Sequence, residues 1–358
     1  MRLCLSCVGA ASVMRSHVLG IDILPSYHAR LTERRRHMQA LLRLLGDGAF
    51  HSGEDLGTAL GVTRSAVWKK LQQLQADTGI DIHKVRGRGY RLAEPLCLLS
   101  EDLLDSESRE RGWSTHVYDR IDSTNAQAMR LVQGGGRLPL PLLVLAEQQT
   151  AGRGRRGRKW VSPFAENIYY SLALRIDGGM RQLEGLSLVV GLAVVKMLHQ
   201  AGINGAGLKW PNDILVGGRK LAGVLLELTG DPADVCHVVI GIGINVNMQV
   251  AEEVDQSWTS MRLETGRALD RNRVVASLSQ QLFTCLDHHG KQGFAAFKEE
   301  WEANHLWQGR SVTLLSGSGA IEGLVVGVDS VGALRLSVGG QVQAFSGGEL
   351  SLRLRESD

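Results

Sequence analysis

The chain has 358 residues, of which 44% are hydrophobic, and its formal net charge is +3 at pH 7. A chain of this length can form two or three domains with buried cores. The net charge is too small to indicate nucleic-acid binding unless the basic residues are concentrated locally. The longest apolar stretch, residues 186–198, is interrupted by Gly191 and Lys196. It is shorter than the roughly 20 residues of a membrane-spanning helix, so it predicts a buried helix and no membrane anchor.

Cysteine usage and the first residues of the chain bear on its compartment. The cysteines are Cys4, Cys7, Cys97, Cys236 and Cys285. Their number is odd, and no second C-x-x-C completes a zinc site, which favours a reduced, cytoplasmic protein without a metal site of its own. Residues 1–36 contain a short apolar and basic stretch without a sharp cleavage pattern. We expect them to form a poorly ordered N-terminal extension.

Residues 37–97 predict a winged helix-turn-helix domain. Apolar positions at helical spacing over residues 38–45 precede a short helix over residues 52–60. Thr63 is expected to cap a third helix over residues 64–76. Two short helices around a glycine-containing turn are typical of a helix-turn-helix.

The third helix and the strands after it are predicted to contact DNA. The outward side of the helix carries hydrogen-bond donors and a flat ring, which suit phosphates and base edges. Residues 80–92 read as two strands joined by a basic, glycine-rich tip, the wing of a winged helix. A helical interaction domain with a merely solvated basic face is the alternative. The predicted DNA contacts are Arg64, Ser65, Trp68, Lys69, Arg86 and Arg88.

Residues 98–305 predict an α+β sheet domain, because runs of strands are separated from runs of helices. Residues 306–358 contain short strands punctuated by glycine at a spacing of about ten residues, which is typical of a small β-barrel. The strands expected between these bounds cover residues 142–147, 169–175, 208–210, 214–216, 221–229 and 235–245, and the helices lie near residue 101 and over residues 183–200, 273–288 and 293–302.

The most unusual segment is residues 152–159, in which five of eight residues are cationic and the other three are glycine. Such a loop can wrap around a phosphate or carboxylate anion and present guanidinium groups to it. It matches the dinucleotide-binding pattern G-x-G-x-x-G, but such a site needs a helix after the glycines and here a strand-like run follows, so we reject this motif. It does not match a P-loop, because Arg158 occupies the lysine position and Lys159 the serine or threonine position. A solvated basic loop or a nucleic-acid patch is the alternative.

Five motifs occur in order along the central region. They are Asp-Ser-Thr-Asn at 122–125, Gln-Thr-Ala-Gly-Arg-Gly-Arg-Arg-Gly-Arg-Lys-Trp at 149–160, Lys-Trp-Pro-Asn-Asp at 209–213, Gly-Arg-Lys-Leu-Ala-Gly at 218–223 and Gly-Ile-Gly-Ile-Asn at 241–245. Together they resemble biotin protein ligase, and the winged helix makes the chain similar to the bifunctional form that is also the biotin operon repressor. The resemblance covers about residues 37–354 and implies an SH3-like β-barrel at the C-terminal end.

The resemblance implies a two-step reaction. Biotin and ATP would give biotinyl-5′-AMP and pyrophosphate, and a lysine of the biotin carboxyl carrier protein of acetyl-CoA carboxylase would then attack the adenylate. Mg²⁺ would arrive with ATP. The same resemblance implies a homodimer when the adenylate is bound, and binding of that dimer to the operator DNA of the biotin genes.

The site residues follow from the same resemblance. Lys220 would bridge the biotin carboxylate and the α-phosphate, and Arg153 would contact biotin and the phosphates. Arg155 would lie in the segment that closes on the adenylate, and Asp213 would position the nucleotide or a metal. Further ligand-binding positions are Ser123, Thr124, Asn125, Gln149, Gly152, Gly154, Trp160, Lys209, Asn212, Gly223 and Asn245.

Some of these residues also have a purely structural interpretation. Residues 123–125 are typical of a helix N-cap, and Trp160 could be a core residue. Two other functions also remain open, a lipoate protein ligase with the same adenylation chemistry and a transcription factor whose central domain only senses a ligand. The arginine-rich loop and Lys220 favour the biotin ligase.

Overall fold

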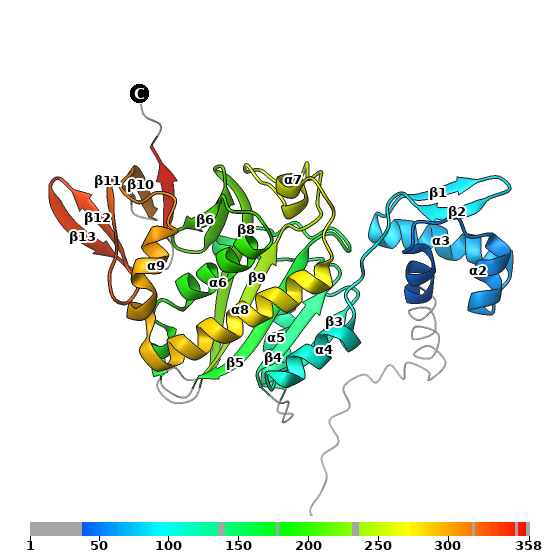
Figure 1. Ribbon diagram of the computed structural model, residues 1–358, viewed down its shortest axis with the longest axis horizontal. Helices are drawn as coiled ribbons and strands as arrows, with labels where there is room; N and C mark the ends of the chain where they lie inside the picture. The colour runs from blue at the N-terminus through cyan, green and yellow to red at the C-terminus, as the bar shows by residue number, and fades with distance from the viewer. Residues whose placement is uncertain are drawn as a thin grey trace, which may run out of the picture.

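The computed structural model describes residues 38–134, 140–176, 179–230, 236–316, 319–347 and 350–355. The expected N-terminal extension, with Cys4 and Cys7, lies outside the described residues. Figure 1 shows a winged-helix domain at one end of the molecule, a central sheet, and a smaller group of strands at the other end. Within the described part, no helix is long and apolar enough to cross a lipid bilayer.

The N-terminal domain has the predicted helix-turn-helix and wing. The residues 38–45 are helical. The remaining elements are α2 (Gly53–Leu60), α3 (Arg64–Thr78), β1 (Ile82–Val85) and β2 (Gly89–Leu92). Thr63 is the N-cap of α3, as expected, since its Oγ1 accepts a hydrogen bond from Ala66 N at 3.3 Å. The helix ends at Thr78, two residues later than predicted, and its C-cap is Gly79, whose φ of 74° is in the left-handed region.

The core of the winged-helix domain includes side chains from the central domain. Phe164 and Ala165 are buried in the same cluster as the leucines of the helix-turn-helix. At the edges of this contact, Gln39 Nε2 donates to Asp119 Oδ1 at 2.8 Å, and Arg262 pairs with Glu94. The winged helix therefore packs directly on the central sheet domain.

The central domain contains a seven-stranded mixed sheet, which confirms the predicted α+β class. Its strand order is β3-β4-β5-β9-β8-β7-β6, with β3 and β4 parallel and the other neighbours antiparallel. The strands are β3 (Ser114–Tyr118), β4 (Leu142–Ala146), β5 (Ile168–Ile176), β6 (Ala206–Lys209), β7 (Asp213–Val216), β8 (Arg219–Gly230) and β9 (Cys236–Ile244).

Helices cover both faces of this sheet (Figure 1). Two of them, α6 (Leu186–Gln200) and α8 (Arg271–Gln292), pack on one face, and α5 (Thr124–Gln133) packs on the other. The apolar stretch at residues 186–198 is a buried helix, as predicted, because α6 packs both on the sheet and against α8. The other helical segments are α4 (Glu101–Glu110), η1 (Arg155–Gly157), η2 (Gly179–Leu183), α7 (Met261–Thr265), η3 (Phe294–Phe297) and α9 (Lys298–Ala303).

The C-terminal region is a five-stranded antiparallel sheet in the order β13-β12-β11-β10-β14. In the described residues β13 and β14 are the outer strands and do not pair with each other, so the hydrogen bonding itself does not close a barrel. Buried residues of this sheet, among them Val312 and Leu336, belong to the same apolar cluster as the central domain. The strands are β10 (Ser311–Ser316), β11 (Gly319–Val328), β12 (Leu334–Val338), β13 (Gln341–Phe345) and β14 (Ser351–Leu354).

A buried histidine lies at the junction of the central and C-terminal regions. His305 is 4% exposed and stacks on Trp301 with ring centroids 4.7 Å apart. Its Nε2 accepts from Trp210 N at 3.5 Å, so the neutral imidazole fits this position. Burial lowers the pKa of His305 to about 4, although a hydrogen bond to Gln308 works in the opposite direction.

We expect His305 to make the protein less stable at mildly acidic pH. The unfolded chain binds a proton near pH 6.5 and the folded chain only near pH 4, so the contribution is complete above pH 6.5 and is lost as the pH falls towards 4. The free energy of unfolding should decrease by on the order of 3 kcal/mol across this window. Denaturant titrations of the wild type and His305→Gln should show a shallower pH dependence in the variant. Equal slopes would contradict the assignment.

Candidate active site

Two cavities adjoin at the central sheet, the smaller of them against its middle strands β5, β9 and β8. The larger has a volume of about 310 Å³ and the smaller about 50 Å³. The larger is bounded partly by the C-terminal region, through Leu350 and Leu352. Their common wall consists of Gly154, Arg155, Trp160, Asn212 and Lys220.

The arginine-rich loop closes over this junction as a folded turn. Gly154 N donates to Arg158 O at 2.7 Å, and η1 forms between them. Arg155 Nη1 donates to Asn212 Oδ1 at 2.8 Å, and Lys159 pairs with Glu253 at 2.6 Å. No helix follows, in agreement with the rejection of a dinucleotide-binding motif. The loop instead presents cations to both cavities.

The smaller cavity is lined by neutral polar groups at the N-terminus of α5. Ser123, Thr124 and Asn125 are each 4% exposed. Ser123 Oγ accepts from Ala126 N at 3.5 Å, so this residue both caps the helix and lines the cavity. Gln149 Oε1 accepts from Thr124 N at 2.8 Å and from Thr124 Oγ1 at 3.1 Å. These bonds fix the direction of each amide and hydroxyl before a ligand arrives.

Arg153 and Asn125 share one carboxylate. Arg153 Nη2 lies 3.1 Å from Glu227 Oε1, and Asn125 Nδ2 donates to Glu227 Oε2 at 2.8 Å. The Asn125 amide occupies the space where a Cβ on Gly241 would project. Gly241 is thus required by the packing of a pocket side chain, which explains one glycine of the motif at 241–245.

The indole of Trp160 forms the floor between the two cavities. It lies against Gly223 and Gly243, which are direct partners on β8 and β9, and a Cβ on either would meet the ring. In the described part of the chain, the buried Trp160 Nε1 has no hydrogen-bond acceptor. Gly243 was not among the predicted site residues, although its motif was noted, because its role depends on a side chain from a distant loop.

A cluster of charges lies where the cavities join. Lys220 Nζ is 2.6 Å from Asp213 Oδ1 and 5.4 Å from the centre of the Trp160 ring, and Lys209 Nζ is 3.6 Å from Asp213 Oδ2. Burial works to raise the pKa of Asp213, but the charges of Lys220 and Lys209 outweigh it and hold this pKa below its usual value. Burial also lowers the pKa of Lys209. One ionised carboxylate therefore holds two ammonium groups at the junction.

The structure brings nearly all predicted ligand-site residues together. Every one lines at least one cavity except Gly152, whose absent side chain leaves room for Trp160 O, Ser162 Oγ and Gln149 Nε2. Asn245 lines the larger cavity, but its Nδ2 donates to Thr259 O at 3.0 Å, which also gives it a structural role.

The predicted DNA contacts lie elsewhere, on α3 and the wing. Arg64, Ser65, Trp68, Lys69, Arg86 and Arg88 are all exposed. Trp68 is 45% exposed, and the Arg88 guanidinium stacks 4.3 Å from the centre of the Phe50 ring. Exposed basic side chains therefore lie on both α3 and the wing. Among the described residues, no group of three or more His, Cys, Asp or Glu side chains could hold a metal ion.

A sheet domain with two adjoining cavities that are both lined by cationic side chains, fused to a winged helix, defines the class: a winged-helix DNA-binding protein with a site suited to anions. Comparison with known proteins gives the family. The model of the biotin/lipoate A/B protein ligase family matches residues 117–245, an HTH domain model matches residues 36–91, and the biotin protein ligase C terminal domain matches residues 309–353.

Whole-length relatives agree with these matches. The bifunctional ligase/repressor BirA of Escherichia coli is 41% identical over 88% of this chain and 97% of its own length, and that of Bacillus subtilis is 32% identical over 85% and 94%. The structure of biotin protein ligase from Aquifex aeolicus in complex with biotin and ATP is 31% identical, with a TM-score of 0.59 over 67% of this chain and 99% of that one. The chain belongs to the family of bifunctional biotin protein ligases and repressors.

Proposed function

We propose that the smaller cavity binds biotin, the larger binds ATP, and Lys220 and Arg155 act where the two meet. The observation that carries this proposal is the common wall, since a carboxylate from one cavity and an α-phosphate from the other would converge on the same two cations. Domain boundaries near residues 97 and 305 suit this arrangement, with the winged helix before the ligase domain and the antiparallel sheet after it.

The smaller cavity suits the ureido ring of biotin. That ring is neutral and both donates and accepts hydrogen bonds, as do the hydroxyls and amides of Ser123, Thr124 and Gln149. A volume of about 50 Å³ is far below the 300–1,000 Å³ of ordinary ligand pockets, so we expect lining groups such as the Trp160 ring to move when biotin enters. Movement of Trp160 would also offer its unpaired Nε1 to a ligand acceptor.

The first chemical step joins two anions. A carboxylate oxygen of biotin attacks the α-phosphorus of ATP, the bond to pyrophosphate breaks, and biotinyl-5′-AMP forms. Lys220 would draw both anions together and stabilise the charge that develops at phosphorus. Asp213 keeps the Lys220 ammonium in place beforehand, at 2.6 Å. Arg155, held by Asn212, adds a second fixed charge.

Mg²⁺ fits this site as a companion of the phosphates. Asp213 is a carboxylate at the larger cavity, and it is already paired with two lysines. The ion would therefore be held chiefly by phosphate oxygens and water, with Asp213 nearby, and would neutralise the leaving pyrophosphate. In the second step, the amine of the carrier lysine attacks the acyl carbon, and AMP leaves.

We further propose that the same protein is a repressor controlled by its own intermediate. The winged helix offers few cations per subunit, and a single module of this kind binds DNA weakly. A symmetric dimer would place two modules on two half-sites and multiply the affinity. Ordering of the loops around the adenylate would be the trigger for dimerisation.

The experiment that tests the ligase proposal is transfer of a labelled acid to a carrier domain. Biotin and lipoate should be compared in the same assay, because the matching family model includes lipoate ligases. Label from biotin on one carrier lysine supports the proposal. Label from lipoate and none from biotin would assign the chain to the other branch of the family.

Arg155 is expected to retain the adenylate. It is half-buried, and its Nη2 donates to Leu350 O at 3.4 Å in addition to the bond with Asn212. Removal of a charged hydrogen-bonding group costs about 1.5–3 kcal/mol, so Arg155→Ala should release biotinyl-5′-AMP roughly 10–100-fold faster. The released adenylate should label lysines of bystander proteins. Arg219→Ala removes the same charge from an exposed position that lines neither cavity and should retain the adenylate. Equal bystander labelling by the two variants would refute the role of Arg155.

A further inference from the structure

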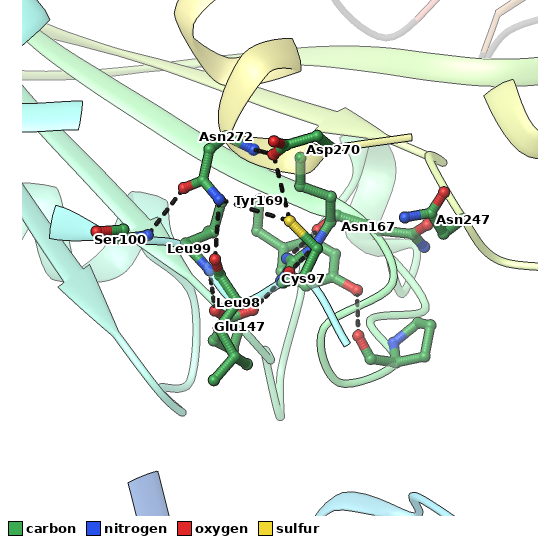
Figure 2. Close-up of polar contacts among 12 residues, drawn as sticks. Cys97, Leu98, Leu99, Ser100, Glu147, Asn167, Tyr169, Asn247, Asp270 and Asn272 are labelled. Carbon is green, nitrogen blue, oxygen red and sulfur yellow. Dashed lines mark hydrogen bonds and ion pairs between the residues drawn. The ribbon is translucent and has the colours of Figure 1, made fainter. Parts of the chain in front are cut away.

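The segment that joins the winged helix to the ligase domain is fastened to the first turn of α8. Asn272 Oδ1 accepts from Ser100 N at 2.8 Å, and Asn272 Nδ2 donates to Leu98 O at 2.9 Å. The Cys97 thiol donates to Asp270 Oδ1 at 3.2 Å. Figure 2 shows these bonds side by side along one stretch of chain. Residues 97–100 therefore follow a fixed path.

A buried ion pair supports this path from the other side. Arg271 has no exposed surface and pairs with Glu147 at 2.5 Å. Its Nε donates to Cys97 O at 3.1 Å, and its Nη1 donates to Asn167 O at 3.0 Å. The second oxygen of Glu147 accepts from Leu99 N at 2.6 Å (Figure 2). We call residues 97–100, Glu147, Asn167, Arg271 and Asn272 the linker network.

The composition of this network favours a positioning role over a stabilising one. Burial of two charges costs several kcal/mol per ion, and an apolar pair of similar volume would stabilise the core as well or better. An apolar pair could not hold three backbone groups at set distances, two of them in the linker and one just before β5. The bonds to Cys97 O, Leu99 N and Asn167 O require these polar atoms.

The network also reaches the segments that line the smaller cavity. Glu147 is two residues before Gln149, and Asn167 is two residues before Tyr169, which lines the same cavity. Asn167 Oδ1 accepts from Val246 N at 3.0 Å, next to Asn245. Asn272, by contrast, bonds only to the linker and to the helix that carries it in the described residues. Asn272 thus holds the linker alone, whereas Arg271 holds both the linker and the segment that leads to the smaller cavity.

We propose that Arg271 is a positioning residue that fastens the winged-helix domain to the pocket-lining segments of the ligase domain, and that Asn272 secures the linker end of this connection. The consequence for DNA rests on the proposed repressor function. A winged helix held at a fixed angle in each subunit lets a dimer meet two half-sites at one spacing. If the linker is loosened, the orientation of the winged helix relative to the ligase domain has to be fixed whenever DNA binds. The conformational entropy lost in that step weakens DNA binding.

The test compares Arg271→Lys and Asn272→Ala with Arg273→Ala, whose side chain is 90% exposed and lies one position beyond the network. Lysine keeps the charge opposite Glu147 but cannot reach Cys97 O and Asn167 O at once. Amide hydrogen exchange at Leu99 and Ser100 should become about tenfold faster in the first two variants, as expected for the loss of one or two hydrogen bonds. Small-angle X-ray scattering of the ligand-free proteins should show a wider spread of distances in both.

Enzyme kinetics distinguish the role of Arg271 from that of Asn272. Arg271→Lys should raise the KM for biotin several-fold with little change in kcat, because it disturbs the pocket-lining segments. Asn272→Ala should leave both constants at the wild-type value. Both variants should weaken operator binding about tenfold at saturating adenylate. Arg273→Ala should behave as the wild type in every assay.

Two results would overturn the proposal. One is exchange and scattering in Asn272→Ala that match those of Arg273→Ala, and the other is a loosened linker with undiminished operator affinity. If Arg271→Lys fails to fold cooperatively, Asn272→Ala still decides, since it leaves the ion pair intact. Absence of operator binding by the wild type would refute the repressor function instead. In that case the positioning role of the linker network would still be tested by hydrogen exchange, X-ray scattering and the KM for biotin, none of which requires DNA.

Discussion

Replacement of Lys220 by alanine is expected to lower the rate of adenylate formation by about 10²–10³, the usual cost of one preorganised electrostatic stabiliser. Lys220 lines both cavities, and its ammonium is held by Asp213 at 2.6 Å. Its charge assists most when the carboxylate approaches the phosphate, so the loss should appear chiefly in kcat. The measurement is biotin- and ATP-dependent release of pyrophosphate.

The control for this change is the neighbouring cation. Arg219→Ala removes one positive charge at the start of β8, but Arg219 is 49% exposed, pairs with Glu264 and lines neither cavity. This variant should form the adenylate at nearly the wild-type rate. An unchanged rate in Lys220→Ala, or an equal loss in both variants, would be incompatible with a bridging role for Lys220.

Operator binding is expected to depend steeply on salt and on the adenylate. If a dimer makes about 6–10 phosphate contacts through α3 and the wing, its affinity should fall about 10³–10⁵-fold between 50 and 200 mM salt, because each contact releases counterions. Binding should be cooperative in protein concentration and stronger with biotinyl-5′-AMP present. The dependence of binding on salt and on the adenylate should be measured with DNA from the promoter region of the biotin biosynthesis genes.

Substitutions in the winged helix give the matching control. Lys69→Ala and Arg86→Ala should weaken binding at low salt and reduce the slope of affinity against salt. Neither residue lines either cavity, so adenylate formation should be unchanged in both variants. Equal affinity with and without adenylate, or no binding at low salt, would refute the repressor function and leave the ligase function standing.

Local features of the fold could be predicted from sequence because they depend on neighbouring residues. Thr63 and Ser123 are recognisable as helix caps, and both cap helices in the structure. The start of α8 was placed two residues late, because Asp270 was not recognised as its N-cap, although its Oδ1 accepts from Asn272 N at 2.9 Å. The expected helix over residues 183–200 begins only at Leu186, since the residues before it form the short helical turn η2.

Long-range features could not be predicted in this way. The burial of Phe164 in the winged-helix core, and the apolar cluster that Val312 shares with the central domain, join parts of the chain that no local pattern relates. The pairing of Asn125 with Gly241 likewise depends on β9 lying beside β5. The linker network joins Cys97 to Arg271 across 174 positions of sequence. Motif order along the chain indicated which residues belong to the site, but only the folded sheet shows how they share two cavities.

The most direct test of the central claim is transfer of labelled biotin to a carrier domain, with and without ATP. Incubation of the purified protein with biotin, ATP and Mg²⁺ should place the label on one lysine of the carrier, and omission of ATP should abolish it. Preformed biotinyl-5′-AMP should restore transfer without ATP, since it bypasses the first step. Absence of label with all substrates present, or label that does not depend on ATP or the adenylate, would contradict the assignment of this chain as a biotin protein ligase.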